Sequence, residues 1–252
     1  MRRSDRLHAI MERLAKDGSV AVSALSHGLG VSEASVRRDL SFLEAQRWLS
    51  RTHGGAVVRS LPVGLSLPSA PARRQAERFE IGRLAAERVP EGARVGLAAG
   101  GLSVAIARAL AGRASLTVVT NQLDAAHELS LREGVTVMVT GGVAFSGSPV
   151  LTGPMVESSL REVHLDLVII GGDGIDPESG LTAEDPLVAH AARVFRDVSR
   201  RAVAVFDAPQ VGRTAFARIC PLAEVAELLT ADDVDPELRD KIDDAGVGVV
   251  TE

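Results

Sequence analysis

The spacing of hydrophobic residues changes near residue 60, from a helical rhythm with short turns to apolar strands that alternate with helices. Before the change, four apolar residues recur three or four positions apart and predict a first helix: Leu7, Ile10, Met11 and Leu14. Gly18 is expected to end this helix. Val20 and Val22 then predict the start of a short strand.

Two further helices are predicted directly afterwards. The first is expected over 24–29, with Ser23 as its N-cap and Gly30 as its stop. The second is expected over 33–46, with Ser32 as its N-cap. Together with the first helix, they predict a helix-turn-helix arrangement.

The third predicted helix has one apolar face. Val36, Leu40 and Leu43 are spaced four and three residues apart, so they can pack on the first two helices. The faces turned away from that core carry arginines, small hydroxyls and one carboxylate: Glu33, Ser35, Arg37, Arg38 and Ser41. Arginine offers a fork of donors for guanine edges or phosphates, so such a helix is suited to the major groove of DNA. The simpler alternative is a solvated helix face.

A β-hairpin is predicted next, over the sequence WLSRTHGGAVV. Gly54 and Gly55 are expected to adopt backbone angles that other residues avoid. A hairpin after a recognition helix is a wing, from which Arg51 and His53 can contact backbone phosphate or a minor groove. Trp48 is expected in the core of the wing.

The segment Arg59–Pro71 holds three prolines, one glycine and three serines, and predicts a linker. Beyond it, strands are expected over 94–98, 116–120, 135–140, 165–171, 202–207, 227–230 and 247–251. Helices are expected over 73–88, 103–111, 123–133, 155–162, 186–199 and 236–245. Several strands are apolar on both faces, which is typical of a mostly parallel sheet covered by helices on both sides. The predicted organisation is a winged helix-turn-helix in 1–58, a linker in 59–72 and an open α/β domain in 73–252.

Charge is distributed unevenly along the chain. The net charge is −5, yet residues 1–60 hold 10 Lys and Arg against 6 Asp and Glu, and the remainder holds 18 against 27. A basic head on an acidic body favours contact with phosphate at the head. We expect neither a signal peptide nor a membrane span, because no long apolar run occurs. The one cysteine, Cys220, favours a buried apolar role and a reducing cytoplasm as the location.

Three strings in the head stand at a specific spacing: RRDL, then LE, then RTHGGA. With Val31 and Ser32 before them, they resemble the DNA-binding domain of the DeoR family of bacterial repressors. One departure is Arg47, where that family usually has glycine. Asp39 is expected to be a structural partner of a nearby arginine and not a base reader. The residues expected to contact double-stranded DNA are Ser23, Ser32, Glu33, Ser35, Arg37, Arg38, Ser41, Arg51, His53 and Gly54.

The body carries short motifs at predicted strand ends or helix starts: Thr120-Asn121, Gly141-Gly142, Gly153, Asp166–Gly174, Gly180–Thr182 and Asp207. On these motifs, residues 73–251 are similar to the DeoR C-terminal domain, which shares a fold with ribose-5-phosphate isomerases, glucosamine-phosphate deaminases and CoA transferases. For a typical member, the resemblance implies a sugar-phosphate effector. Ligands of open parallel sheets bind beyond the carboxyl ends of the strands. The residues expected at the effector are Gly100, Gly101, Ser103, Thr120, Asn121, Gly141, Gly142, Asp173, Gly174, Asp207 and Gln210.

Two departures from that family bear on the effector. The family usually carries Asp-x-Gly-Thr-Thr after its first sheet strand, whereas residues 98–102 read AAGGL here. Gln210 stands where the family has a lysine, and a neutral amide supplies no cation to an anion. We therefore expect an effector that is not a conventional sugar phosphate or that binds weakly, with Arg213 as one replacement cation.

No metal or cofactor is expected. His127, His164 and His190 lack metal-ligand spacing, and Asp173–Glu178 misses the register of a calcium loop and predicts a polar turn. Neither a dinucleotide-binding fingerprint nor a Walker loop occurs.

These observations predict a homo-oligomeric repressor of a carbohydrate operon. Its heads would bind repeated half-sites, and a sugar-like or phosphorylated effector would shift them off the DNA. Activation in place of repression stays open. So do two other functions: a sugar-phosphate isomerase-like enzyme with Asp207 and Glu184 as acid and base, and a ligand-independent DNA-binding module with a decayed pocket.

Overall fold

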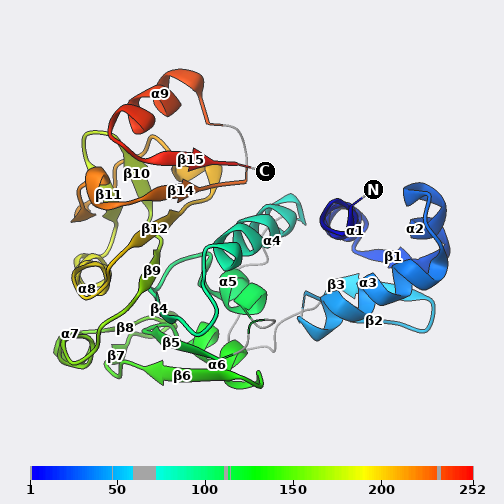
Figure 1. Ribbon diagram of the computed structural model, residues 1–252, viewed down its shortest axis with the longest axis horizontal. Coiled ribbons are helices and arrows are strands. Elements are labelled where there is room, and N and C mark those ends of the chain that lie inside the picture. Colours follow the sequence, from blue (N-terminus) through cyan, green and yellow to red (C-terminus); the bar gives the residue numbers. More distant parts are fainter. Residues whose placement is uncertain are drawn as a thin grey trace. The chain divides into compact units, whose positions relative to one another are not determined.

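The computed structural model describes residues 2–46, 48–58, 72–110, 113, 115–231 and 234–251. The chain divides into two compact units, Met1–Glu80 and Ile81–Glu252 (Figure 1). The division falls within helix α4 (Ala72–Glu87), whose first part belongs to the head and whose second part belongs to the body. The predicted linker Arg59–Pro71 and Arg47 lie outside the described residues.

The head is a winged helix-turn-helix, as predicted. Its helices are α1 (Arg3–Asp17), α2 (Val22–Leu29) and α3 (Glu33–Ala45). Strands β1 (Ser19–Ala21), β3 (Gly55–Val58) and β2 (Leu49–Arg51) form an antiparallel sheet in the order β1-β3-β2. The apolar faces meet in one core, in which Ile10, Leu14, Leu25, Leu40 and Leu43 are almost completely buried. Gly18 and Gly30 end α1 and α2 in the left-handed conformation, with φ of 71° and 63°.

Two local predictions for the head are wrong. Ser23 does not cap α2, because that helix begins at Val22 and the amide of Val22 donates to the carbonyl of Gly54 in the wing at 2.9 Å. Neither Gly54 nor Gly55 adopts a positive φ. Gly55 is needed for a different reason: a Cβ there would overlap the carbonyl oxygen of Val20, because β1 and β3 approach closely.

The body contains a seven-stranded sheet in which every neighbouring pair is parallel. In spatial order its strands are β15 (Gly248–Val250), β14 (Glu227–Leu229), β12 (Ala202–Val205), β9 (Leu167–Ile170), β4 (Arg94–Leu97), β5 (Leu116–Thr120) and β6 (Val135–Val139). All seven strands were expected from the sequence. The strand order reverses between β4 and β9, because β5 and β6 extend the sheet on one side and β9, β12, β14 and β15 on the other.

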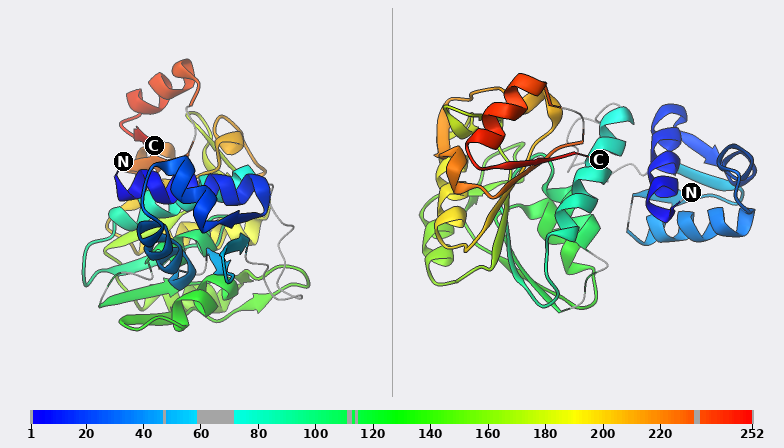
Figure 2. Two further views of the ribbon diagram at one scale, coloured as in Figure 1. Left: turned by 90° about the vertical axis from the view of Figure 1, so that its right-hand side faces the viewer. Right: turned by 45° about the horizontal axis from the view of Figure 1, so that its top comes forward.

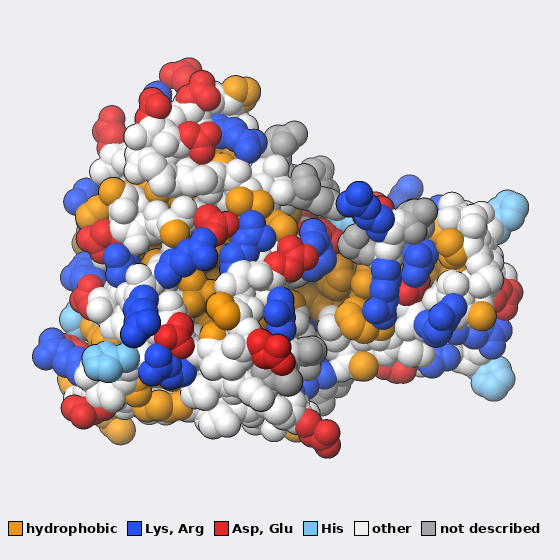
Figure 3. Space-filling view, in the orientation of Figure 1, with side chains coloured by type: hydrophobic (Ala, Val, Ile, Leu, Met, Phe, Trp, Pro, Cys, Tyr) orange, Lys and Arg blue, Asp and Glu red, His pale blue; other side chains and the backbone are white. Residues whose placement is uncertain are grey.

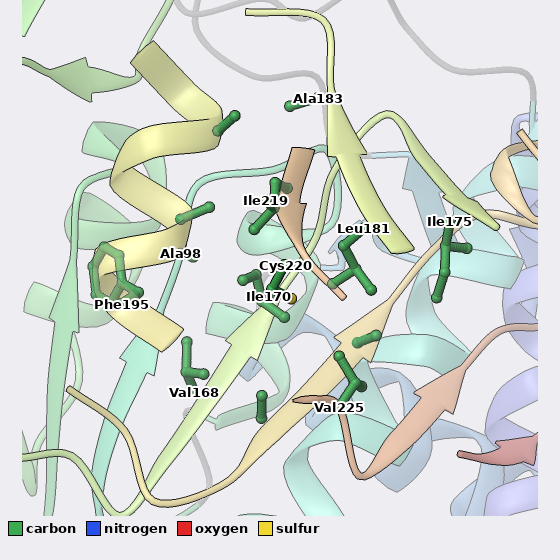
Figure 4. Packing of buried hydrophobic residues seen from close by; sticks show 14 of the residues in the cluster. Ala98, Val168, Ile170, Ile175, Leu181, Ala183, Phe195, Ile219, Cys220 and Val225 are labelled. Atoms are coloured by element: carbon green, nitrogen blue, oxygen red, sulfur yellow. The ribbon is translucent and has the colours of Figure 1, made fainter. Parts of the chain in front are cut away.

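Helices cover both faces of this sheet, as its two-sided apolar strands predicted (Figure 2). One buried cluster joins the sheet to the second part of α4, to α5 (Ser103–Leu110) and to α6 (Leu123–Ser130). The other joins it to α7 (Pro154–Arg161), α8 (Pro186–Asp197) and α9 (Pro236–Asp244), and Figure 4 shows Phe195 of α8 in this cluster with Val168 and Ile170 of β9. The side chains of β9 alternate between the two clusters, since neighbouring residues of a strand point to opposite faces.

Five short strands were not predicted: β7 (Val143–Ala144), β8 (Leu151–Thr152), β10 (Gly174–Asp176), β11 (Gly180–Ala183) and β13 (Ala217–Cys220). The last three form a small antiparallel sheet in the order β10-β11-β13. The polar turn predicted over Asp173–Glu178 is only partly a turn, because Gly174–Asp176 forms β10. The turn itself follows β10, where the Asp176 carboxylate accepts the amides of Glu178 and Ser179 at 3.0 Å each. Among the described helices, none combines the length and the apolar character that a membrane crossing needs.

Candidate functional site

Helix α3 is fixed to the head by its apolar face and by one buried carboxylate. Its N-terminus is capped as predicted, since the Ser32 hydroxyl accepts the amide of Ser35 at 3.3 Å. Asp39 is 2% exposed and accepts two bonds from Arg6 of α1, from Nε at 2.6 Å and from Nη2 at 3.2 Å. Asp39 is therefore the structural partner of an arginine that the sequence indicated. This fork holds α1 and α3 in a fixed relative orientation.

The opposite face of α3 is exposed and carries Arg37 and Arg38. Arg37 is 62% exposed, and its guanidinium donates to Glu33 one turn earlier at 3.0 Å. Arg38 donates to the carbonyl of Ala34 and to the Ser35 hydroxyl, both at 3.3 Å. These bonds are local and face solvent, so they cost little to exchange for a ligand. Figure 3 shows Lys and Arg side chains gathered on the visible face of the head.

The wing is tied to α3 by polar contacts. The amide of Arg51 donates to Glu44 at 2.9 Å, and the Arg51 guanidinium donates to the Ser41 hydroxyl at 2.9 Å. His53 and Gly54 stand exposed at the tip of the hairpin. The residues of α3 and of the wing that are expected to contact DNA thus lie close together. Ser23, which is also expected there, is exposed in the first turn of α2.

Trp48 packs in the core of the wing, as expected. It is 6% exposed, and its ring meets that of Phe79 edge to face, with centroids 5.0 Å apart. Phe79 lies in the part of α4 that belongs to the head. The sequence did not indicate that α4 completes the core of the head, because this depends on the contact between Phe79 and Trp48, which are 31 residues apart.

In the body, a small pocket lies at the carboxyl ends of β4, β9 and β12, where the strand order reverses. This is the place where open α/β sheets hold ligands. Its lining includes Gly100, Gly101, Ser103 and Gln210 of the predicted residues, together with Ala98, Leu102, Ile106, Ile169, Gly171, Gly172 and Val205. The cavity volume is about 10 Å³, which is near the minimum for a single water molecule.

The polar side chains around this pocket bond to the protein itself. The Ser103 hydroxyl donates to the carbonyl of Ala98 at 3.0 Å. Gln210 bridges two loops, since its Nε2 donates to the Gly172 carbonyl at 3.0 Å and its Oε1 accepts the amide of Asp207 at 2.9 Å. The amide that replaces the family's lysine therefore holds the ends of β9 and β12 together.

Two amide side chains at the end of β5 hold the loop that follows β4. Asn121 Oδ1 accepts the amide of Ala99 at 2.9 Å, and Gln122 Oε1 accepts the amide of Gly100 at 3.1 Å. Both side chains are buried. Gln122 was not among the residues expected at the effector, although its position directly after Asn121 at the end of a strand was an available signal. In this structure, the amides of Ala99 and Gly100 are thus already bonded to carbonyl oxygens of side chains.

The other predicted effector residues are dispersed around the carboxyl ends of the strands. Thr120 is buried and donates to the Leu97 carbonyl at 2.7 Å. Gly141 and Gly142 have φ of 72° and 124° in the loop between β6 and β7, so at these positions the glycines allow a turn. Asp173 is exposed and accepts the amide of Glu184 at 2.8 Å. The remaining two residues are Gly174 in β10 and Asp207, which caps the short helix Ala208–Gln210.

No group of three potential metal ligands occurs among the described His, Cys, Asp and Glu side chains. The single thiol also lies apart from the pocket lining. Cys220 is buried in the core that α8 covers, and burial raises the pKa of its thiol to about 12.

An anchored helix with exposed arginines, a wing beside it, and an α/β unit with a crevice at its strand-order reversal together define a winged helix-turn-helix transcription regulator with a sensor domain. Residues 6–60 match the family model described as DeoR-like helix-turn-helix domain, and residues 73–232 match the one described as DeoR C terminal sensor domain. The chain belongs to the DeoR family of transcription regulators.

Curated proteins named as transcription regulators match this chain over nearly their whole length. The chain is 30% identical over 98% of its residues to a putative aga operon transcriptional repressor of Escherichia coli O157:H7, covering 93% of that protein. It is 31% identical over 98% of its residues to the HTH-type transcriptional regulator GlpR of Haloferax volcanii, covering 97% of that protein. A glycerol-3-phosphate regulon repressor of Escherichia coli K12 is 29% identical, with 91% of each chain covered.

Solved structures with a related outline are more distant. RipA from Yersinia pestis matches 75% of this chain and 54% of its own, with a TM-score of 0.47 and 14% identity. Ribose 5-phosphate isomerase A from Methanocaldococcus jannaschii matches 53% of each chain, with a TM-score of 0.40 and 14% identity.

Proposed function

We propose that the chain represses a carbohydrate-metabolism operon by inserting the N-terminal half of α3 into the major groove of operator DNA. The exposed pair Arg37 and Arg38 carries this proposal, because their bonds are local and Asp39 holds the helix beneath them in place. Ser32 and Ser35 lie at the helix N-terminus, where the peptide dipoles attract a phosphate. Arg51 and His53 would contact the backbone from the wing.

The test is selection from a random pool of DNA duplexes by the full chain, followed by fluorescence anisotropy with the selected sequence at fixed salt. Specific binding should exceed binding to a shuffled duplex by at least about 10³-fold. Equal affinity for both duplexes would contradict the proposal.

We propose that the chain acts in the cytoplasm, because its target would be chromosomal DNA. We also propose a homo-oligomer, whose heads would read paired half-sites.

For the effector, we propose a small phosphorylated or sugar-like molecule that binds at the strand-order reversal. The relatives named for aga and glycerol-3-phosphate regulation support this chemical class. The present volume of about 10 Å³ is too small for such a molecule, and we propose that binding opens the Gln210 bridge. A ligand that binds the native state raises the melting temperature. Sugar phosphates, their unphosphorylated sugars and inorganic phosphate should therefore be compared by thermal shift.

A Gln210→Ala variant sharpens this test. It removes both bonds of the bridge, so a true effector should bind the variant more tightly than the wild-type chain. The control is Glu178→Ala, an exposed change in the turn between β10 and β11. If a compound of the panel raises the melting temperatures of the wild-type chain and of Gln210→Ala equally, it binds elsewhere.

A second candidate function is a DNA-binding module that needs no effector. The closed pocket favours it, because Ser103, Asn121, Gln122 and Gln210 all bond to the protein itself. If no compound raises the melting temperature and none weakens DNA binding, this function is preferred. We do not propose catalysis, since the similar proteins are named as regulators. Turnover of a sugar phosphate by the purified chain would reverse that choice.

A further inference from the structure

Strand β6 lies at one edge of the seven-stranded sheet (Figure 1). It pairs in parallel with β5 from Val135 to Val139, and no strand of the described chain pairs with its other side. The amino acids of the strand are VTVMV. Proteins usually protect such an edge with a charge, a proline, a bulge or a covering segment. This strand has no charge or proline, and its register with β5 shows no shift.

The hydrogen bonds to β5 determine which backbone groups face outward. The amide of Leu116 donates to the carbonyl of Gly134 at 3.1 Å, and the amide of Thr140 donates to the carbonyl of Thr120 at 3.1 Å. Backbone groups of successive strand residues point to opposite sides, so the even-numbered residues of β6 face β5. The amides and carbonyls of Val135, Val137 and Val139 therefore face outward.

Exposed apolar side chains are concentrated in the segment that contains this edge. The described chain has eight exposed large hydrophobic residues, of which five fall between Leu123 and Phe145: Leu123, Leu131, Val139, Val143 and Phe145. They belong to α6, which contacts β6, to β6 itself, and to the segments that follow these elements. Val143 and Phe145 are 58% and 57% exposed. Their concentration in the segment that contains an edge unpaired in the described chain favours an interaction surface there.

We propose that β6 pairs with β6 of a second copy of this chain, antiparallel, about a two-fold axis through Val137. The outward groups are self-complementary in this register: Val137 meets its own counterpart, and Val135 meets Val139 in both directions. Each of these three pairs exchanges two hydrogen bonds. The apolar side chains around β6 then flank the joined edges. This arrangement is an isologous interface of the kind that closes a dimer.

A second copy fits this edge better than a foreign peptide does. The strand carries no charge that would select an acidic or a basic partner, and its register is symmetric about its central residue. The segment beyond residue 60 holds an excess of acidic residues, so two bodies repel each other least where an uncharged edge meets its copy. The pairing deepens the proposed homo-oligomer but is tested without DNA, so its failure leaves the proposed DNA binding standing.

Cysteine cross-linking of full-length chains tests the register. In the proposed pairing, Thr136 lies opposite Met138 of the copy, with Cα atoms about 4.5 Å apart, which suits a disulfide. An equimolar mixture of an affinity-tagged Thr136→Cys variant and an untagged Met138→Cys variant should form a mixed disulfide dimer under mild oxidation. Each variant alone should form far less. Native Cys220 is buried and does not compete. Absence of the mixed dimer, or equal yields in all three samples, overturns the proposal.

Sedimentation equilibrium supplies the second test. Thr136 is exposed, so Thr136→Lys adds a charge to the edge without entering the core. Its matched control is Ala223→Lys, exposed in the short helix Leu222–Glu224. The dimer dissociation constant should rise about tenfold for Thr136→Lys and stay unchanged for Ala223→Lys. A wild-type chain that is monomeric at all concentrations, or an assembly that Thr136→Lys leaves intact, overturns the proposal. Circular dichroism confirms that each variant is folded.

Discussion

The buried pair between Asp39 and Arg6 gives the sharpest quantitative prediction for the head. Asp39 is 2% exposed and the Arg6 side chain is 15% exposed, with Nε 2.6 Å from the carboxylate. Breaking a buried pair by removing one partner costs about 3–5 kcal/mol. We expect Arg6→Ala to fall at the lower end of this range, about 3 kcal/mol, because the exposed Arg3 also lies against Asp39, with its Nε 3.6 Å from the carboxylate. Asp39→Ala should cost a similar amount, about 2–4 kcal/mol, because the guanidinium that is left behind still reaches water.

The double variant separates the pair from its surroundings. Removing both charges leaves no buried charge, so Arg6→Ala/Asp39→Ala should be less destabilised than the sum of the single variants by about 2–3 kcal/mol. The assay is urea unfolding followed by the fluorescence of Trp48. It is the chain's one tryptophan, the chain has no tyrosine, and Trp48 is buried in the head. Urea is preferred because a salt-type denaturant would screen the charges.

An exposed pair on the same helix serves as the control. Arg37→Ala removes the surface contact with Glu33, which is worth about 0.3–0.5 kcal/mol. If Arg6→Ala and Asp39→Ala add within about 0.5 kcal/mol in the double variant, the two residues are not coupled. In that case the Arg6–Asp39 pair does not hold α3 against α1.

Three further predictions concern separate parts of the chain. Gly55→Ala should displace the wing and lower both head stability and DNA affinity, whereas Gly54→Ala, with open space around its Cβ, should resemble the wild-type chain in urea unfolding and anisotropy. Cys220 should stay unreactive toward thiol reagents at pH 8 in the native chain and react after unfolding, because burial raises its pKa to about 12. The bonds from Arg94 lower the pKa of Asp166 to about 2, below an unfolded value of about 3.9, so this carboxylate stabilises the fold above pH 4 and loses that effect between about pH 4 and pH 2. Circular dichroism should therefore show a shallower acid-induced loss of stability for Asp166→Asn than for the wild-type chain, and an identical loss would contradict this. Rapid labelling of native Cys220 would contradict the second prediction. Equal behaviour of the two glycine variants would contradict the first.

Hydrophobic spacing was sufficient to predict the long elements of this chain. The three helices of the head and all seven strands of the main sheet follow from period and composition, because each buries an apolar face several residues long. The short strands of the small sheet were missed. Gly174–Asp176 and Gly180–Ala183 are too brief for a period, and they exist because they pair with each other and with Ala217–Cys220.

The candidate sites show the same limit. A helical wheel drawn from the sequence places Arg37 and Arg38 on the exposed face of α3. The same wheel places Asp39 where it can meet an arginine of the head. The role of Gly55 depends on the approach of β1, a contact between distant segments that no local pattern encodes. The bonds of Gln122 and Gln210 likewise join segments far apart in sequence, so only the folded sheet reveals them.

Whether the outward face of α3 reads DNA can be measured by fluorescence anisotropy. The wild-type chain, Arg37→Ala and Arg38→Ala are compared on one selected duplex at one salt concentration. Loss of an arginine that reads a base should cost about 1–3 kcal/mol, or roughly 5- to 150-fold in affinity. We expect this loss in at least one of the two variants, with Trp48 fluorescence showing that the head stays folded. Wild-type affinity in both variants would contradict this expectation.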